Sequence, residues 1–146
     1  MKITNICLNI TEACNFRCDY CFFNKYPKDM DIETAKQALR WLKNHNPESK
    51  QLHVQFFGGE PMLRFDFIKE VMEYSKTLHG PIWKFGITTN GSLFTTEKLN
   101  YLIDNKVNIL LSLDGKKEIH DRHRKLANGK GTFELIKPWF KPLIES

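Results

Sequence analysis

Three cysteines within eight residues constrain this chain more than any other feature of its sequence. Cys14, Cys18 and Cys21 are spaced C-x3-C-x2-C, directly after a short apolar segment. Zinc sites and ordinary cubane clusters usually take four protein ligands. The one other cysteine, Cys7, falls within the apolar segment, where we expect it to be a buried strand residue. The spacing therefore predicts a metal cluster with one corner left for a ligand that is not protein.

The rest of the sequence favours reduced, metal-binding thiols. Residues 1–10 contain no signal-peptide core, and no apolar run reaches the roughly 18 residues that span a bilayer. We therefore expect a cytoplasmic protein that does not enter a membrane, where cysteines stay reduced. Two disulfides, or a zinc site built on the three thiolates, are the alternatives that the cysteine count leaves open.

Composition fits one globular domain. The chain has 146 residues, of which 41% are hydrophobic and 27% charged. Its formal net charge of +5 would suit an acidic partner, but the lysines are spread along the chain without a block of five like charges. We therefore expect a solvated basic surface and no binding of nucleic acid.

Hydrophobic periodicity predicts an alternation of strands and helices. We expect strands at residues 3–10, 51–57, 82–88 and 107–113, the last buried on both faces because it is almost continuously apolar. Helices are expected from a cap at Asp29 or Asp31 to about Asn46, from Phe65 to Leu78, and from a cap at Thr95 or Thr96. Residues 132–144 predict a fourth helix, kinked or shortened by two prolines.

This alternation predicts an α/β fold with a parallel sheet, right-handed crossovers and helices outside. About four βα units make half of an eight-fold barrel, so we expect a partial TIM-like barrel. Polar and glycine-rich segments follow each expected strand: the cysteine loop, Gly58-Gly59-Glu60-Pro61, Asn90-Gly91, and Ser112 to Gly115. Each segment alone is an ordinary turn former. Together they are expected at one edge of the sheet, where such folds bind ligands.

Read together, these motifs resemble the radical S-adenosylmethionine enzymes. The cysteine spacing matches their cluster motif, with Tyr20 as the aromatic residue before the third cysteine. The segments Gly58–Pro61, Thr89–Gly91 and Ser112–Gly115 are similar to the motifs that follow the second, third and fourth strands of that family. The resemblance extends from Ile6 to about Phe133 and implies that residues 1–146 are the N-terminal part of the catalytic core domain.

A second set of residues is similar to the subgroup that matures peptides and proteins, which includes the anaerobic sulfatase-maturating enzymes. These residues are His120-Asp121-x2-Arg124 and the segment Gly129 to Phe133. Members of that subgroup carry a cysteine-rich C-terminal extension of SPASM type for further clusters. No cysteine follows Cys21 in this chain, so the sequence departs from the subgroup there.

The resemblance implies a specific chemistry. Three cysteines would hold a [4Fe–4S] cluster whose fourth iron binds S-adenosylmethionine, and reductive cleavage would yield a 5′-deoxyadenosyl radical that abstracts hydrogen from a peptide or protein side chain. An electron donor such as flavodoxin or ferredoxin is the implied redox partner. Carried over to this chain, the implied contacts are Tyr20 at the adenine, Gly58, Gly59, Glu60 and Pro61 at the methionyl amine, Asn90 in the third-strand motif, Ser112 and Asp114 at the ribose, and Arg124, or its neighbour Arg122, at the methionyl carboxylate.

Two other functions remain open at this point. One is a non-catalytic iron–sulfur or peptide-binding module that keeps the fold without the reaction. The other is a radical enzyme of the same family that acts on a small molecule.

Overall fold

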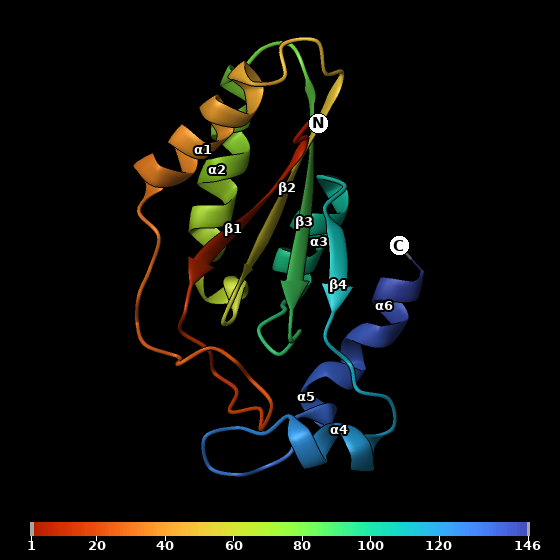
Figure 1. Ribbon diagram of the computed structural model, residues 1–146. Helices are drawn as coiled ribbons and strands as arrows, with labels where there is room; N and C mark the ends of the chain where they lie inside the picture. The colour runs from red at the N-terminus through yellow and green to blue at the C-terminus, as the bar shows by residue number, and fades with distance from the viewer. Residues whose placement is uncertain (1, 146) are drawn as a thin grey trace.

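The computed structural model describes residues 2–145, and its centre is a sheet of four parallel strands (Figure 1). The strands lie in the order β1-β2-β3-β4, so each pairs with the next along the chain. Their bounds are β1 Asn5–Thr11, β2 Gln51–Gly58, β3 Ile82–Thr89 and β4 Asn108–Leu111. This confirms the predicted α/β class, and the carboxyl ends of all four strands meet at one edge.

The first three strands are each followed by a helix: α1 Ile32–Asn44, α2 Phe65–Thr77 and α3 Thr96–Asp104. Side chains of Asp31 and Thr95 accept hydrogen bonds from the first turns of α1 and α3, so of the two candidates predicted for each cap these are the ones that serve. The helices α1 and α2 lie side by side against one face of the sheet (Figure 1). The apolar residues of the strands that point to that face form the core, as in the stacked pair Phe56 and Phe85.

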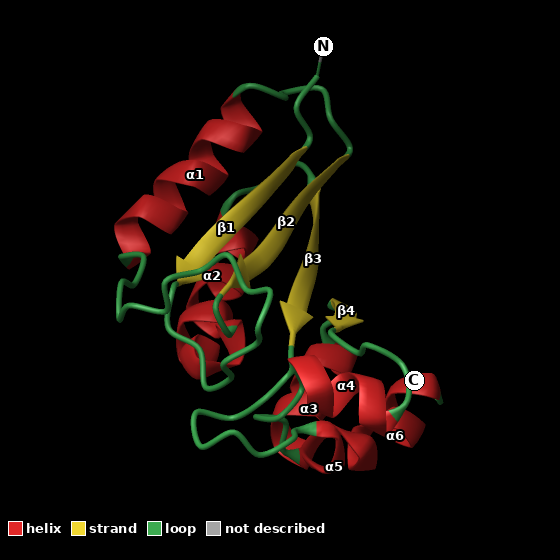
Figure 2. Cartoon of the chain, turned by 60° about the horizontal axis from the view of Figure 1, so that its bottom comes forward, coloured by secondary structure: helices red, strands yellow, loops and turns green. Residues whose placement is uncertain are grey.

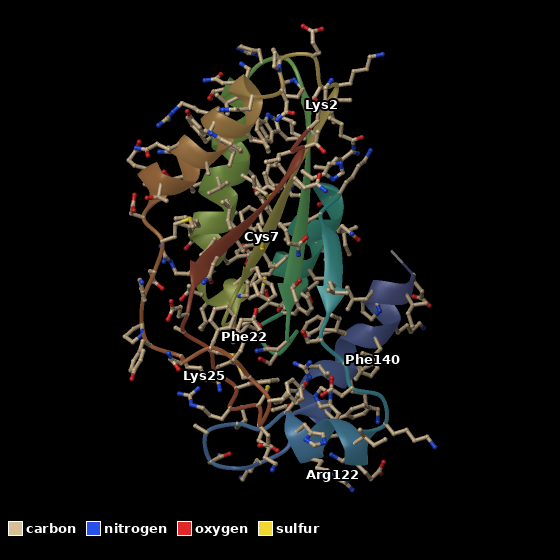
Figure 3. All side chains as sticks on the ribbon, viewed as in Figure 1. Lys2, Cys7, Phe22, Lys25, Arg122 and Phe140 are labelled. Atoms are coloured by element: carbon tan, nitrogen blue, oxygen red, sulfur yellow. The ribbon has the colours of Figure 1, made fainter. Side chains whose placement is uncertain are left out.

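The opposite face of the sheet carries no helix among residues 2–145 (Figure 2). Its side chains are mostly polar, with exceptions such as Ile82 and Leu110. Burial alternates along β1 and β2, so that Leu8 and Val54 are buried while Cys7 and His53 are exposed. The prediction that Cys7 is buried is therefore wrong: the side chain lies on the open face of β1 (Figure 3). Period-two alternation decides this, because Cys7 precedes the buried Leu8 by one position.

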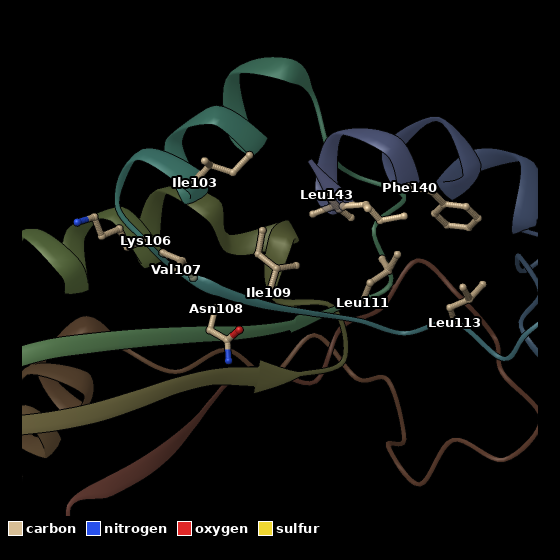
Figure 4. A pocket seen from close by; sticks show the side chains of 10 residues that line it. Ile103, Lys106, Val107, Asn108, Ile109, Leu111, Leu113, Phe140 and Leu143 are labelled. Atoms are coloured by element: carbon tan, nitrogen blue, oxygen red, sulfur yellow. The ribbon is translucent and has the colours of Figure 1, made fainter. Parts of the chain in front are cut away.

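The strand β4 is shorter than predicted and is not buried on both faces. Within the described chain it pairs with β3 alone, and Leu110 on its open side is 62% exposed. Its other side faces an apolar groove of about 630 Å³ between α3 and α6 (Phe140–Ile144), where Ile109 and Leu111 meet Leu143 (Figure 4). Apolar content predicted burial, but an edge strand lacks the second neighbour that would complete it.

The loop after β4 contains a helix that the sequence pattern did not predict, α4 Lys117–His123. The segment expected as one final helix is divided into α5 Phe133–Ile136, the 3₁₀ turn η2 Lys137–Trp139 and α6, as its prolines predicted. Another 3₁₀ turn, η1 Pro61–Arg64, precedes α2. No helix within residues 2–145 is both long and apolar enough to cross a membrane.

Candidate active site

A pocket of about 170 Å³ opens at the carboxyl edge of the sheet. Its walls come from the loop after β1 and from the ends of β2, β3 and β4. Of the residues predicted from sequence, the structure places these around it: Cys14, Cys18, Tyr20, Cys21, Gly58, Gly59, Glu60, Asn90, Ser112 and Arg124. Two predicted residues lie beside it instead: Pro61 is buried at the start of η1, and Asp114 contacts two of the lining side chains.

The glycines after β2 fix one side of the cysteine loop. Gly59 N–H donates to the Thr11 carbonyl at 2.8 Å, and Glu60 N–H donates to the Ala13 carbonyl at 2.8 Å. A Cβ atom on Gly59 would lie 2.2 Å from the Ala13 oxygen, a contact that no side chain can make. Glycine is therefore required at position 59, because its backbone lies directly against the backbone of Ala13. This contact positions the neighbouring Cys14 at the pocket.

The other side of the cysteine loop is held by the segment that follows α4. Arg17 N–H donates to the Lys125 carbonyl at 2.6 Å, and Asp19 N–H donates to the His123 carbonyl at 3.1 Å. Phe16, which is fully buried, also forms a β-bridge with Leu126. The residues between the first and third cysteines are therefore clamped by backbone hydrogen bonds from a distant part of the sequence.

All four cysteines are free thiols, so the disulfide alternative is not seen among them. Burial raises the pKa of Cys14, partly offset by a hydrogen bond from Phe16 N–H. Burial also raises the pKa of Cys18, partly offset by the nearby charge of Arg124. At Cys14 and Cys18 burial therefore favours the neutral thiol, and a metal ion would have to displace the proton on binding.

The donor set fits an iron–sulfur cluster. Three cysteine sulfurs line one pocket, and thiolates are the usual ligands of such clusters. Within residues 2–145, no group of three or more His, Cys, Asp or Glu side chains is already arranged to hold a metal ion. A cluster at this position is inferred from three thiols that share a pocket, rather than from a preformed coordination geometry.

The carboxylate of Glu60 is fully buried and is bonded to the protein. It accepts hydrogen bonds from Met62 N–H at 3.0 Å, from the Thr89 hydroxyl at 2.7 Å and from Asn90 N–H at 2.7 Å. Burial raises its pKa, and these three donors oppose that shift. The carboxylate thus ties the end of β2 to the end of β3. Sequence reasoning expected it to face a ligand amine, which stays a prediction, and it missed Thr89 as a site residue.

Asn90 extends this network to the cysteine loop. Its side-chain amide donates to Asn15 Oδ1 at 2.9 Å and lies 4.0 Å from Cys14 Sγ. Its oxygen accepts from Ser92 N–H at 3.0 Å and from the Ser92 hydroxyl at 2.7 Å. Neither Asn15 nor Ser92 was singled out from the sequence, although both are short polar residues next to motif positions.

Beside the thiols, Tyr20, Asp114 and Arg124 form a compact cluster. The Tyr20 hydroxyl donates to Asp114, whose other oxygen lies 3.1 Å from Arg124 Nε, and the guanidinium sits 5.4 Å from the centre of the Tyr20 ring. Burial and the bond to Asp114 raise the pKa of Tyr20. Burial acts against ionisation of Asp114, but the hydrogen bond from Tyr20 and the ion pair with Arg124 hold the pKa of that carboxyl below its usual value.

The two arginines that compete for the methionyl carboxylate lie in different places. Arg124 lines the pocket with a side chain that is 16% exposed, whereas Arg122 is exposed on α4 (Figure 3) and does not line it. The pocket is therefore lined by a cation, by three thiols and by the glycines at the end of β2. Such a set of groups suits a small zwitterionic ligand held beside a metal cluster.

Comparison with known proteins agrees with this geometry. The profile of the Radical SAM superfamily matches residues 8–145. An uncharacterised protein of Methanocaldococcus jannaschii is 34% identical over 136 residues, which cover 91% of this chain and 46% of the relative. A cysteine-type anaerobic sulfatase-maturating enzyme of Clostridium novyi is 32% identical over 136 residues, covering 86% and 36%. A GTP 3′,8-cyclase of Psychromonas ingrahamii is 32% identical over 138 residues, covering 92% and 39%.

Comparison of the fold with solved structures agrees with the sequence matches. A solved structure of native anSMEcpe with bound AdoMet and Cp18Cys peptide superposes with a TM-score of 0.84 at 27% sequence identity, covering 97% of this chain and 40% of that one. This chain spans between about a quarter and a half of the length of the curated relatives it matches. The matching profile covers nearly all of the chain, and the fold and the cysteine pocket agree with it: the chain belongs to the Radical SAM superfamily.

Proposed function

We propose that this protein binds a [4Fe–4S] cluster through Cys14, Cys18 and Cys21, and S-adenosylmethionine beside it. When bound, the cluster supplies the electron that cleaves the sulfonium to methionine and a 5′-deoxyadenosyl radical, which takes hydrogen from a substrate carbon. The observation that carries the proposal is that three thiols share one pocket with the ends of β2, β3 and β4. The polypeptide binds and orients the cofactors and the substrate, and it excludes competing reactions.

The proposed contacts to S-adenosylmethionine follow from the walls of the pocket. The backbone at Gly58 and Gly59, with the one lone-pair site that Glu60 keeps free, accepts from the methionyl amine. Arg124 binds the methionyl carboxylate, for which a guanidinium is well shaped. Tyr20 and Ser112 then lie toward the adenine and the ribose.

Arg124 and Asp114 already pair with each other at 3.1 Å, which has a consequence for ligand entry. The carboxylate of the ligand has to share the guanidinium with Asp114, and the ribose has to share Asp114 with Tyr20. Since Arg has five donors and a carboxylate about four acceptor sites, both groups have capacity left for the ligand.

For the substrate, we propose a peptide or protein side chain. The matches to sulfatase-maturating enzymes and to a solved structure that holds a peptide support this class. A flavodoxin or ferredoxin is the proposed electron donor, and the cytoplasm, where thiols stay reduced, the proposed location. A small-molecule substrate is the second candidate, favoured by the similarity to a GTP 3′,8-cyclase over most of this chain.

Anaerobic reconstitution with iron and sulfide tests the proposal. Loaded protein is expected to contain about four iron atoms per chain and to release 5′-deoxyadenosine with S-adenosylmethionine and a strong reductant. A colourless protein that binds one zinc ion would refute the cluster. A fully loaded cluster without deoxyadenosine would instead support the non-catalytic alternative.

Deuterium transfer separates the substrate classes. Candidate peptides and nucleotides labelled at carbon would be incubated with the loaded enzyme, and deuterium counted in the 5′-deoxyadenosine. Transfer from a peptide supports the proposal, whereas transfer from a nucleotide alone would favour the second candidate.

A further inference from the structure

His120 is a fully buried imidazole on α4 that does not line the pocket, yet it contacts both segments that carry the pocket's charged pair. Its Nδ1 lies 3.4 Å from the Asp114 backbone nitrogen, and its Nε2 lies 3.0 Å from the Thr132 hydroxyl. The Thr132 hydroxyl in turn donates to the Arg124 carbonyl at 2.8 Å. One buried side chain therefore stands between Asp114 and Arg124.

The directions of these hydrogen bonds fix the proton on the ring. Because the Thr132 hydroxyl hydrogen is used on the Arg124 carbonyl, its oxygen must accept from His120, so Nε2 carries the hydrogen. The remaining nitrogen, Nδ1, is then an acceptor, as the approach of Asp114 N–H requires. The whole chain of bonds is satisfied by one neutral tautomer.

The position of Thr132 is itself secured by Asp121. That carboxylate accepts from Thr132 N–H at 2.7 Å and from Phe133 N–H at 2.8 Å, and Lys117 pairs with it at 2.7 Å. The Phe133 ring also meets the His120 ring edge-on at 5.8 Å between centroids. The hydroxyl is thus held at a fixed point between the histidine and the backbone of Arg124.

The chain of hydrogen bonds ends on the carbonyl of Arg124, a residue of the site. Arg124 lines the pocket and pairs with Asp114, and the residues on either side of it, His123 and Lys125, accept the backbone bonds from the cysteine loop. A movement of the Arg124 backbone would therefore shift the guanidinium and the loop between the cysteines together.

We propose that His120 is a positioning residue for S-adenosylmethionine: through Thr132 and the Asp114 backbone it sets the guanidinium of Arg124 and the carboxylate of Asp114 at the pocket. This inference rests on the proposed function, because it assigns a role within the same site. Because His120 does not line the pocket, its effect on the ligand passes through Asp114 and Arg124.

Two substitutions test separately the hydrogen bonds made by the two ring nitrogens of His120. In His120→Asn the short amide keeps an acceptor near the Nδ1 position, facing Asp114 N–H, and loses the reach to Thr132. In His120→Gln the longer amide keeps a donor near the Nε2 position and loses the fit to Asp114. Thr132→Val removes the hydroxyl from the same chain, and Thr132→Ser retains it. The exposed His79, beyond the end of α2 and at the opposite edge of the sheet, supplies the control His79→Asn.

The test measures S-adenosylmethionine binding by equilibrium dialysis on cluster-loaded protein, with iron content and thermal unfolding recorded for each variant. His120→Asn and Thr132→Val are expected to raise Kd about tenfold, the loss typical of one hydrogen bond that is broken in a buried chain. The double variant should lose no more than either single one, because both break the same chain. Thr132→Ser and His79→Asn should bind as the wild type does.

The outcomes distinguish this inference from the proposed function. If wild-type protein with a full cluster binds no S-adenosylmethionine, the proposed function itself fails. If the wild type binds and the folded, iron-loaded Thr132→Val and His120→Asn proteins bind equally well, His120 supports only the fold and the inference is overturned. Should His120→Asn not fold, the Thr132→Val and Thr132→Ser pair decides the question by itself.

Discussion

The buried carboxylate of Glu60 offers a sharp test of how the pocket is built. In Glu60→Gln, the amide oxygen can replace the carboxylate oxygen that accepts from Met62 and Thr89. The amide nitrogen then faces Asn90 N–H, where the wild-type oxygen accepts at 2.7 Å, so two donors oppose each other in a buried place. The substitution changes one atom and leaves the volume of the side chain unchanged.

The cost follows from the bonds that are lost. An unsatisfied buried donor costs about 1–3 kcal/mol. Burial raises the pKa of Glu60, so removal of the charge returns part of this free energy. We expect a net loss of about 1–2 kcal/mol in the free energy of unfolding, which at a urea m value of about 2 kcal/mol/M lowers the midpoint by about 0.5–1 M.

Urea unfolding of the reduced protein under anaerobic conditions, followed by circular dichroism, measures this change. The exposed Glu48 supplies a matched control, since Glu48→Gln should leave the midpoint unchanged. A midpoint for Glu60→Gln equal to that of the wild type would refute the reasoning that this carboxylate joins the ends of β2 and β3.

Three further changes test other parts of the site. Cys18→Ala should abolish cluster loading while Cys7→Ala keeps full iron content, because Cys7 lies on the open face of β1 outside the pocket; loss of iron in Cys7→Ala would contradict the three-ligand assignment. Gly59→Ala should destabilise the fold by about 1–3 kcal/mol and lower iron content, since its Cβ would meet the backbone before Cys14; unchanged loading in a folded variant would argue against it. Burial and the nearby charge of Arg124 lower the pKa of His120 from 6.5, so the unfolded chain binds its proton more readily and stability should fall as pH drops below about 6.5. His120→Gln should remove that part of the pH dependence in urea unfolding at several pH values, and an unchanged pH profile would count against it.

Four nearby charges also act on the pKa of His120, on which the predicted pH dependence of stability rests. They come from both the helix and the flanking loops: Arg124 and Lys117 disfavour the protonated ring, and Asp114 and Asp121 favour it. Since these charges largely oppose one another, burial is the main cause of the shift.

Much of the fold was predictable because local patterns agreed with one another. The capping residues Asp31 and Thr95 marked the starts of two helices, and the motifs at the strand ends had to meet once the strands were parallel. The apolar residues of β4 wrongly predicted a strand buried on both faces. Whether such a strand is buried depends on a neighbouring strand or helix, which the local sequence does not describe. Cys7 was misplaced because a general preference of cysteine for interiors was set above the alternation of its own strand.

The sequence predicted which residues form the site, but not which of them bond to one another. Sequence spacing found the thiols, the glycines and Arg124, since each lies in a recognisable motif. That Glu60 bonds to Thr89, or that His120 bonds to Thr132, depends on which side chains meet across the fold. Such pairings are long-range contacts, and no local pattern encodes them.

The clamp on the cysteine loop also bears on the order in which the pocket forms. Arg17 and Asp19 bond to Lys125 and His123, which lie near the other end of the chain. Contacts between distant segments form late, since a long loop must close first. The cysteines leave the ribosome before the segment around His123 and Lys125, so the clamped form of their loop cannot arise until that segment has been made. Until that segment has folded onto the loop, the three thiols lack the backbone hydrogen bonds that hold them in one pocket.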